Sequence, residues 1–320
     1  MHILITGGSG LIGRALTQNF LREGHRVSWL SRTTDTRPPE AFRPYADALQ
    51  VIPWLYAGAE PENRLVALGT PDVVINLAGT SINASRWHKA QKEAILTSRI
   101  SATDTLLQLL QKLPQRPSIF INASALEASR PLALDIDVHA PLSQLVETGT
   151  KFYGLDFLTY VTRVWEGRAA QAKALGMRTI FARFGIVFSR EGGALPELVR
   201  PVRLYVGGPI AGGHQMLSWI HIADVVGMLQ WSIDQTAIDG PLHVAAPEAA
   251  SNAHVIRTIA RLLNRPYWLP VPKALLNVVL GEMSALVTEG YKQTPIEALK
   301  YGYPYRFPDL ESALKDLFRD

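Results

Sequence analysis

A glycine-rich run near the start of this 320-residue chain has the residue types and spacing of a phosphate-binding turn. It reads Gly7-Gly8-Ser9-Gly10-Leu11-Ile12-Gly13, after an apolar run at residues 2–6 and before an amphipathic stretch that continues to residue 23. Glycines let backbone approach a pyrophosphate, and the N-terminus of the following helix offers unpaired N–H groups to the negative charge. The order of strand, turn and helix therefore predicts a dinucleotide site, against the alternative of a glycine-rich turn with no ligand. The expected contacts are Gly7, Gly8, Ser9, Gly10, Leu11 and Ile12.

The residues that end the second apolar run indicate which dinucleotide is bound. Sites that prefer NAD usually carry Asp or Glu there, which binds the ribose 2′-hydroxyl. Here the run at residues 27–30 is followed by Ser31 and Arg32, and no acid comes before Asp35. A guanidinium suits a 2′-phosphate. Ser31 and Arg32 therefore predict a preference for NADP(H) over NAD(H), against the alternative that Arg32 is an ordinary surface arginine.

The elements that must position this turn alternate between apolar runs and amphipathic stretches as far as residue 185. Continuous apolar runs suit strands that are buried on both faces of a parallel sheet. Such runs lie at residues 50–52, 73–79, 118–124 and 179–183, with helices expected at 87–113 and 157–175 and an irregular segment at 127–150. The alternation predicts an α/β fold, a doubly wound parallel Rossmann sheet with ligand at the carboxyl ends of its strands.

The pattern changes after residue 185. We expect a helix at residues 221–233 with His221 or Asp224 near its start, and a late strand at 242–246. Short helices separated by prolines follow, and the apolar stretch from Leu275 to Val287 is expected to be a buried helix. The predicted organisation is a Rossmann domain at residues 1–185, completed by about 220–246. A smaller, mostly helical C-terminal substrate lobe is expected at residues 186–219 and 247–320.

Composition narrows the class of protein. The chain is 47% hydrophobic and has no cysteine, which excludes disulfides and thiolate metal sites and fits a cytoplasmic protein. The net charge is +4, but the basic residues are scattered, so no nucleic-acid partner is expected. No apolar stretch is long enough to span a bilayer and the eight histidines lack metal-ligand spacing, so we expect no membrane partner and no metal. The oligomeric state has no signature in the sequence.

Several stretches together resemble an atypical, epimerase-like family of extended short-chain dehydrogenases/reductases, the type labelled nucleoside-diphosphate-sugar epimerase. The resemblance covers nearly the whole chain. It is carried by the glycine run, Ser31-Arg32 and the stretches at residues 74–79, 86–87, 91–93, 98–99, 183–187, 207–210 and 218–224, with the segment from about Arg265 resembling the short closing domain of that family. The resemblance implies a Rossmann core, bound NADP(H) and a poorly defined substrate.

Carried over residue by residue, the resemblance implies further contacts to the cofactor. Leu77, Ala78 and Gly79 would pass under the adenine ribose and the pyrophosphate, where small residues let backbone come close. Glu93 and Arg99 would face the adenosine side. Ala123 and Ser124 would flank the nicotinamide ribose, and Val187 the nicotinamide face. The alternatives are a surface helix arginine for Arg99 and ordinary core packing for Val187.

The chain departs from the superfamily where proton transfer would take place. The superfamily uses a Tyr-x-x-x-Lys pair, and its positions fall here at Leu158 and Thr162. The stretch Leu126–Arg130 also lacks the aromatic and glycine residues that follow the serine in the closer family. Ser124 remains as a candidate catalytic residue, with no histidine or acid placed by sequence to activate it. Tyr153, Tyr160 and Glu127 could substitute as acid or base, or be ordinary loop and helix residues.

Two functions therefore stay open. One is an NADP(H)-dependent oxidoreductase or epimerase-type enzyme that acts on a small molecule, such as a sugar derivative, with rewired proton transfer. The other is a non-catalytic NADP(H)-binding sensor or regulatory protein, which the missing Tyr-x-x-x-Lys pair would suit. The first rests on the cofactor fingerprint and the expected substrate lobe.

Overall fold

A parallel sheet of seven strands forms the framework of the fold, in the order β11-β6-β5-β4-β1-β2-β3. The computed structural model describes residues 1–54, 67–290 and 292–319. The strands are β1 (His2–Thr6), β2 (Arg26–Ser31), β3 (Leu49–Pro53), β4 (Val73–Asn76), β5 (Ile119–Ala125), β6 (Arg178–Phe184) and β11 (Gly240–Val244). The strand order changes direction on either side of β1, as a doubly wound fold requires, so the predicted fold class is confirmed.

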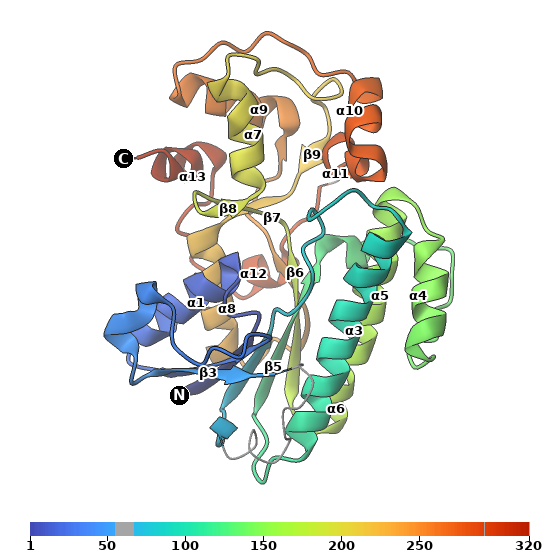
Figure 1. The fold of residues 1–320 in the computed structure, drawn as a ribbon. Helices are drawn as coiled ribbons and strands as arrows, with labels where there is room; N and C mark the ends of the chain where they lie inside the picture. Colours follow the sequence, from blue (N-terminus) through green and yellow to red (C-terminus); the bar gives the residue numbers. More distant parts are fainter. Residues whose placement is uncertain (55–66, 291, 320) are drawn as a thin grey trace.

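Helices cover both faces of the sheet because successive side chains of each strand point to opposite faces. Ile3 and Ile5 pack in one core cluster with Phe20, whereas Leu4 between them packs on the other face with Leu106 and Leu110. Figure 1 shows the two helical layers on either side of the strands. The helices are α1 (Leu11–Arg22) and α8 (Ile222–Asp234) on one face, and α3 (Lys89–Gln111), α5 (Gly154–Ala169) and α6 (Gln171–Ala174) on the other, with a 3-10 turn η1 (Glu40–Tyr45) after β2.

The segment expected to be irregular at residues 127–150 is partly helical, so that prediction was wrong. It contains a 3-10 turn η2 (Leu126–Ser129) and a helix α4 (Leu142–Thr150). Glycine and β-branched residues make α4 a weak helix by propensity. Its stability comes from packing on α3 and α5, where a Cβ at Gly149 would lie 2.6 Å from Leu96.

The region after β6 is more mixed than the mostly helical lobe expected from the sequence. Residues 186–221 and 250–251 contain short strands that the sequence pattern did not reveal, since strands of two to four residues carry too little periodicity. The strands are β7 (Ile186–Ser189), β8 (Gly192–Gly193), β9 (Met216–Leu217), β10 (Trp219–His221) and β12 (Ala250–Ser251). The helices are α7 (Ala194–Arg203), α9 (Asn252–Leu262), α10 (Lys273–Leu280), the 3-10 turn η3 (Gly281–Ser284), α11 (Ala285–Thr288), α12 (Ile296–Lys300) and α13 (Leu310–Leu317).

The apolar stretch at residues 275–287 is not the buried helix that was expected. No residue of α10 is buried, and Leu275 and Val278 are 54% and 74% exposed. The core of this region is instead filled by side chains of α7, α9 and α13 around the stacked rings of Phe188 and Trp219. These three helices occupy the core of the region, and α10 remains at its surface.

His221 and Asp224 order the start of α8, in line with the expectation for these residues. His221 is the N-cap, and its Nδ1 accepts a hydrogen bond from the N–H of Ala223 at 3.0 Å. The fully buried carboxylate of Asp224 accepts hydrogen bonds from the N–H groups of Arg306 and Phe307 at 2.8 and 2.9 Å. The pair therefore ties α8 to the C-terminal segment.

Stability is expected to fall on acidification through His221. Burial lowers the pKa of His221 below its ordinary value of 6.5, although Asp316 and Asp224 act in the opposite direction. The unfolded chain then binds the proton more readily than the folded one, so the free energy of unfolding decreases as the pH falls from 7 to 5. His221→Asn keeps a capping acceptor that does not titrate, and should show a shallower decrease in urea titrations across this range. Equal slopes for the two proteins would contradict this assignment.

Candidate nucleotide-binding site

Nine of the residues predicted to hold a dinucleotide line one cleft of about 1310 Å³. It lies at the carboxyl ends of β1, β2 and β4, where a doubly wound sheet binds its ligands. The nine are Gly7, Gly8, Ser9, Gly10, Ser31, Arg32, Leu77, Ala78 and Gly79. Among the described residues, all that line the cleft precede residue 103, so the C-terminal region contributes none.

The glycine turn is shaped by a close approach between two backbones. Gly7 has a φ of +71°, and a Cβ there would lie 2.7 Å from the carbonyl oxygen of Leu77. The N–H of Gly10 donates to the Gly7 carbonyl at 3.0 Å and closes the turn. A Cβ at Gly13 would lie 2.4 Å from the same Gly7 oxygen, so α1 packs on the turn itself. The helix starts with neither an acid nor a side-chain cap, which leaves its first N–H groups available to an anion.

A buried polar network holds the floor of the cleft. The Thr6 hydroxyl donates to Asn76 Oδ1 at 2.6 Å and accepts from the N–H of Ala78 at 3.2 Å. Asn76 Nδ2 in turn donates to Asn122 at 2.7 Å and to Thr103 at 2.9 Å. Sequence reasoning missed this network. Its signal was a polar residue near the end of each of three apolar runs, at Thr6, Asn76 and Asn122.

Side chains of helix α3 also hold the backbone at Thr80, which lines the same cleft. Ser98 Oγ accepts from the N–H of Thr80 at 2.9 Å, and Arg99 Nη1 donates to the Thr80 carbonyl at 3.0 Å. The Arg99 guanidinium lies 5.0 Å from the Trp165 ring, and burial lowers its pKa to about 10. Arg99 does not line the cleft. In this structure it fixes the backbone that follows Gly79.

The rim of the cleft after β2 carries three arginines. Arg37 donates to both carboxylate oxygens of Asp35, at 2.9 and 2.8 Å, and holds the pKa of Asp35 down at about 2. Arg43 lies 3.6 Å from Glu40. Arg32 forms no ion pair within the described residues and is exposed. Of the three, Arg32 is the cation that can take an incoming anion without first releasing a carboxylate.

Ser124 has an acidic partner that the sequence did not reveal. Its hydroxyl donates to Glu166 Oε1 at 2.6 Å, and Arg183 holds both oxygens of the same carboxylate at 2.8 Å. Glu166 lies 42 residues further along, and only the packing of α5 on β5 brings the two side chains together.

The helix positions that would carry the Tyr-x-x-x-Lys pair are part of the core. Leu158 is buried among apolar side chains of α3 and α5. The Thr162 hydroxyl, also buried, donates to carbonyls of its own helix at 2.9 and 3.0 Å. Neither position offers an acid or base to a ligand.

The three residues that could replace the missing catalytic acid or base differ in their surroundings. The Tyr160 hydroxyl donates to the Leu145 carbonyl at 3.0 Å, which makes it a structural contact between α5 and α4. Tyr153 is 67% exposed at the start of α5. Glu127 follows β5 directly, and burial raises the pKa of its carboxyl.

The remaining predicted contacts lie away from the cleft lining. Glu93 makes a loose ion pair with Lys89, at 3.9 Å, on α3. Leu11 and Ile12 open α1, Ala123 is buried in β5, and Val187 lies in β7. Their roles toward a cofactor remain predictions.

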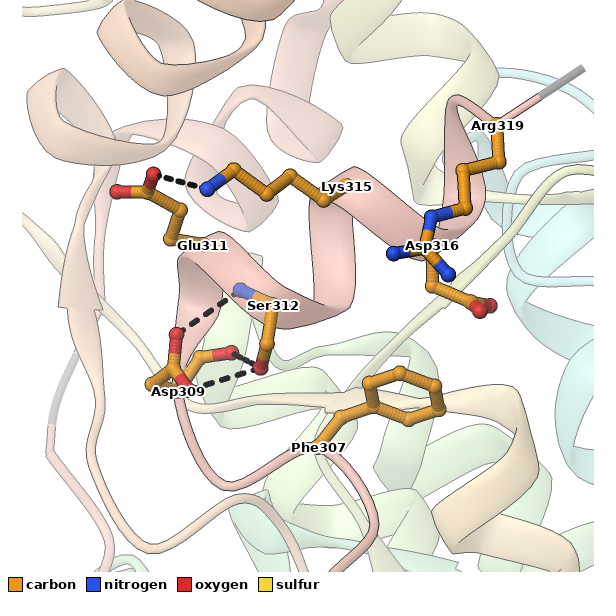
Figure 2. A pocket seen from close by; sticks show the side chains of 7 residues that line it. All are labelled: Phe307, Asp309, Glu311, Ser312, Lys315, Asp316 and Arg319. Carbon is orange, nitrogen blue, oxygen red and sulfur yellow. Dashed lines mark hydrogen bonds and ion pairs between the residues drawn. The ribbon is translucent and has the colours of Figure 1, made fainter.

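A second hollow, of about 410 Å³, lies beside α13 (Figure 2). Most of its polar side chains already pair with other groups of the protein. Asp309 accepts from the N–H and hydroxyl of Ser312 at 2.9 and 2.8 Å, and Lys315 pairs with Glu311 at 2.8 Å. We therefore assign it no chemistry. The described residues also contain no group of side chains suited to a metal ion and no helix long and apolar enough to cross a bilayer.

Comparison with known proteins agrees with this architecture. Residues 3–245 match the model of the NAD dependent epimerase/dehydratase family, and residues 271–317 match a domain of unknown function, DUF1731.

The chain is 38% identical to the epimerase family protein YfhF of Bacillus subtilis, over the whole chain and 99% of the relative. It is 32% identical to the human epimerase family protein SDR39U1, whose crystal structure with NADPH superposes with a TM-score of 0.79 over 99% of each chain. A UDP-glucuronic acid 4-epimerase from Bacillus cereus shares the fold, with a TM-score of 0.71 at 16% identity, over 99% of this chain and 98% of that one. The chain belongs to the NAD dependent epimerase/dehydratase family.

Proposed function

We propose that the protein binds NADP(H) in the cleft and uses it in oxidoreductase or epimerase-type chemistry on a small molecule. The observation that carries the proposal is the continuous cleft that joins the glycine turn, the Arg32 rim and the floor at residues 77–79. The human relative crystallised with NADPH supports this choice of cofactor. A sugar derivative is the substrate class that the family suggests. We further propose that residues 1–185, with about 220–246, form the cofactor domain and the remainder the substrate lobe.

Different groups of residues would contact different parts of the cofactor. The Gly7 turn and the first N–H groups of α1 would hold the pyrophosphate, and Arg32 with Ser31 the 2′-phosphate. Leu77–Gly79 would lie under the adenosine, with Glu93 and Arg99 behind it. Ala123, Ser124 and Val187 would face the nicotinamide half. When bound, the cofactor would supply or accept a hydride.

Ser124 has a restricted part in this chemistry. Because its hydrogen is donated to Glu166, its oxygen can only accept a hydrogen bond from a ligand. Ser124 can therefore hold a hydroxyl group of the ribose or the substrate, but it cannot polarise a carbonyl while Glu166 is ionised. The proton must come from elsewhere, and Glu127, with its raised pKa beside β5, is the candidate.

The second candidate function is an NADP(H)-binding sensor without turnover. It is favoured by Leu158 and Thr162, which bury the positions of the usual catalytic pair. Consumption of NADPH with a panel of carbonyl compounds and nucleotide sugars separates the two. Turnover that is lost in Glu127→Gln, with NADPH affinity retained, supports the enzyme. Tight binding without turnover on the whole panel supports the sensor.

Arg32→Ala tests the cofactor assignment. Loss of a charge-assisted contact to phosphate costs about 1.5–3 kcal/mol, so NADPH affinity should fall about 10- to 100-fold while NADH affinity stays within about twofold. Titration of both cofactors by intrinsic fluorescence measures this. Arg22→Ala is the matched control, since Arg22 is an exposed arginine outside the cleft lining. Equal NADPH affinity in Arg32→Ala and the wild type would refute the assignment.

A further inference from the structure

Three polar side chains stand in register across neighbouring strands at one end of the sheet. Ser124 of β5 is the register partner of Arg183 of β6, which in turn is the partner of His243 of β11. Two residues from outside the sheet join this row. Ser129 ends η2, just after β5, and Glu297 lies on α12, which packs against β11.

The geometry points to a second reactive site, separate from the nucleotide cleft: we infer that Ser129, His243 and Glu297 form a nucleophile–base–carboxylate triad that hydrolyses small carboxylic esters. Ser129 Oγ lies 3.2 Å from His243 Nε2, and His243 Nδ1 lies 2.7 Å from Glu297 Oε2. These are the two contacts by which such triads are recognised, whatever the fold or the order along the chain.

The hydrogen-bond directions around Ser129 are consistent with this role. Arg183 Nη1 lies 2.9 Å from Ser129 Oγ, and a guanidinium can only donate. The Ser129 oxygen therefore accepts from Arg183, which leaves its own hydrogen for His243 Nε2. Glu297 can only accept, so Nδ1 of His243 carries the ring hydrogen and Nε2 is the free base.

Glu297 is held ionised and fixed in place. Burial raises the pKa of Glu297, but hydrogen bonds from the ring and backbone of His243 outweigh it, so its pKa lies below the ordinary value. The backbone N–H of His243 also donates to Glu297 Oε2, at 3.2 Å. The carboxylate thereby fixes the tautomer and orientation of the imidazole and would stabilise an imidazolium.

Exposure is distributed as a nucleophilic site requires. Ser129 is an exposed residue, whereas His243 is only 7% exposed. The Arg183 guanidinium is fixed by its double contact with Glu166 and lies beside the nucleophile. None of the triad residues lines the nucleotide cleft.

The reaction runs in two balanced steps. Ser129 Oγ forms a bond to the ester carbonyl carbon while its proton passes to His243 Nε2, and Arg183 lies beside the developing negative charge. The bond to the leaving alkoxide breaks, and the alkoxide takes the proton from His243, which leaves an acyl ester on Ser129. Water then attacks this ester, gives one proton to His243 and releases the carboxylic acid as Ser129 regains its hydrogen.

A fluorophosphonate probe tests the nucleophile directly. Ser129 should form the phosphonyl ester with loss of fluoride, located by peptide mass spectrometry. Labelling should vanish in Ser129→Ala and slow at least about 100-fold in His243→Gln, as removal of a general base does. Ser118→Ala, which removes another exposed serine, should leave labelling unchanged. Hydrolysis of p-nitrophenyl acetate should follow the same order. An unlabelled wild-type protein, or labelling elsewhere, overturns the inference.

A thiol variant keeps the test informative if His243→Gln fails to fold. The chain has no cysteine, so Ser129→Cys carries a single thiol. Beside His243 that thiol should react with iodoacetamide at pH 7 at least about tenfold faster than the thiol of Ser118→Cys, since a neighbouring base raises the thiolate fraction. Equal rates for the two thiols overturn the inference. These readouts need no NADPH, so they stand apart from the test of Arg32.

Discussion

Gly7→Ala should abolish measurable NADPH binding in fluorescence titrations, with an affinity loss of at least about 100-fold. The added Cβ would lie 2.7 Å from the Leu77 carbonyl oxygen and 2.9 Å from its carbon, both backbone atoms that cannot swing aside. Either the turn or the floor of the cleft must move. The left-handed backbone at a φ of +71° adds about 1–2 kcal/mol of strain for any residue with a Cβ.

Gly24→Ala is the matched control for that experiment. Gly24 has a φ of +79°, and a Cβ there meets no atom within 4 Å. This variant should lose about 1–2 kcal/mol of stability through backbone strain alone and keep its NADPH affinity. If the two variants bind NADPH equally well, the close approach of Gly7 to Leu77 does not shape the site.

Asp224→Ala should lower the free energy of unfolding by about 3–5 kcal/mol, measured by urea titration. The carboxylate is fully buried and accepts from two backbone N–H groups, at Arg306 and Phe307, and from the Tyr303 hydroxyl at 3.2 Å. Alanine would leave these buried donors without an acceptor. Its effect should greatly exceed that of a surface substitution, because desolvated donors cannot turn to water.

Two further variants, Asp234→Ala and Asp224→Asn, serve as controls for this measurement. Asp234 is an exposed acid at the end of the same helix, and its removal should change stability by less than about 0.5 kcal/mol. Asparagine at position 224 keeps one acceptor oxygen and should give an intermediate loss. A loss for Asp224→Ala no larger than that for Asp234→Ala would show that the C-terminal segment does not depend on this carboxylate.

The sheet and the glycine turn could be predicted because their signals are local. Most strands of the sheet contain a short run rich in apolar residues, and β1, the turn and α1 follow one another within residues 2–22. Short-range periodicity and glycine spacing carry that information. The exposed α10 shows the limit of such reasoning. Its apolar composition indicates burial. Whether a helix is actually buried depends on which other elements pack in the core, and composition does not show this.

The contacts that could not be predicted are those between distant segments. Ser124 meets Glu166 across 42 positions, and Ser129 meets His243 across 114. A serine, a histidine and a glutamate scattered along a chain have no spacing to recognise, because the fold alone determines their distances. The sequence indicates which residue types are present, and strand register determines which of them meet.

The position of β11 in the chain and in the sheet determines when the sheet can be completed during synthesis. Among the described strands of this sheet, β1 is central and is made before the other six, whereas β11 lies at one edge and pairs with β6. Domains fold as synthesis proceeds, so β1 to β6 can associate before residue 240 has been made. His243 comes with that last strand and Glu297 still later. A nascent chain can therefore shape its nucleotide cleft, whose described lining lies entirely before residue 103, while Ser129 still lacks its base.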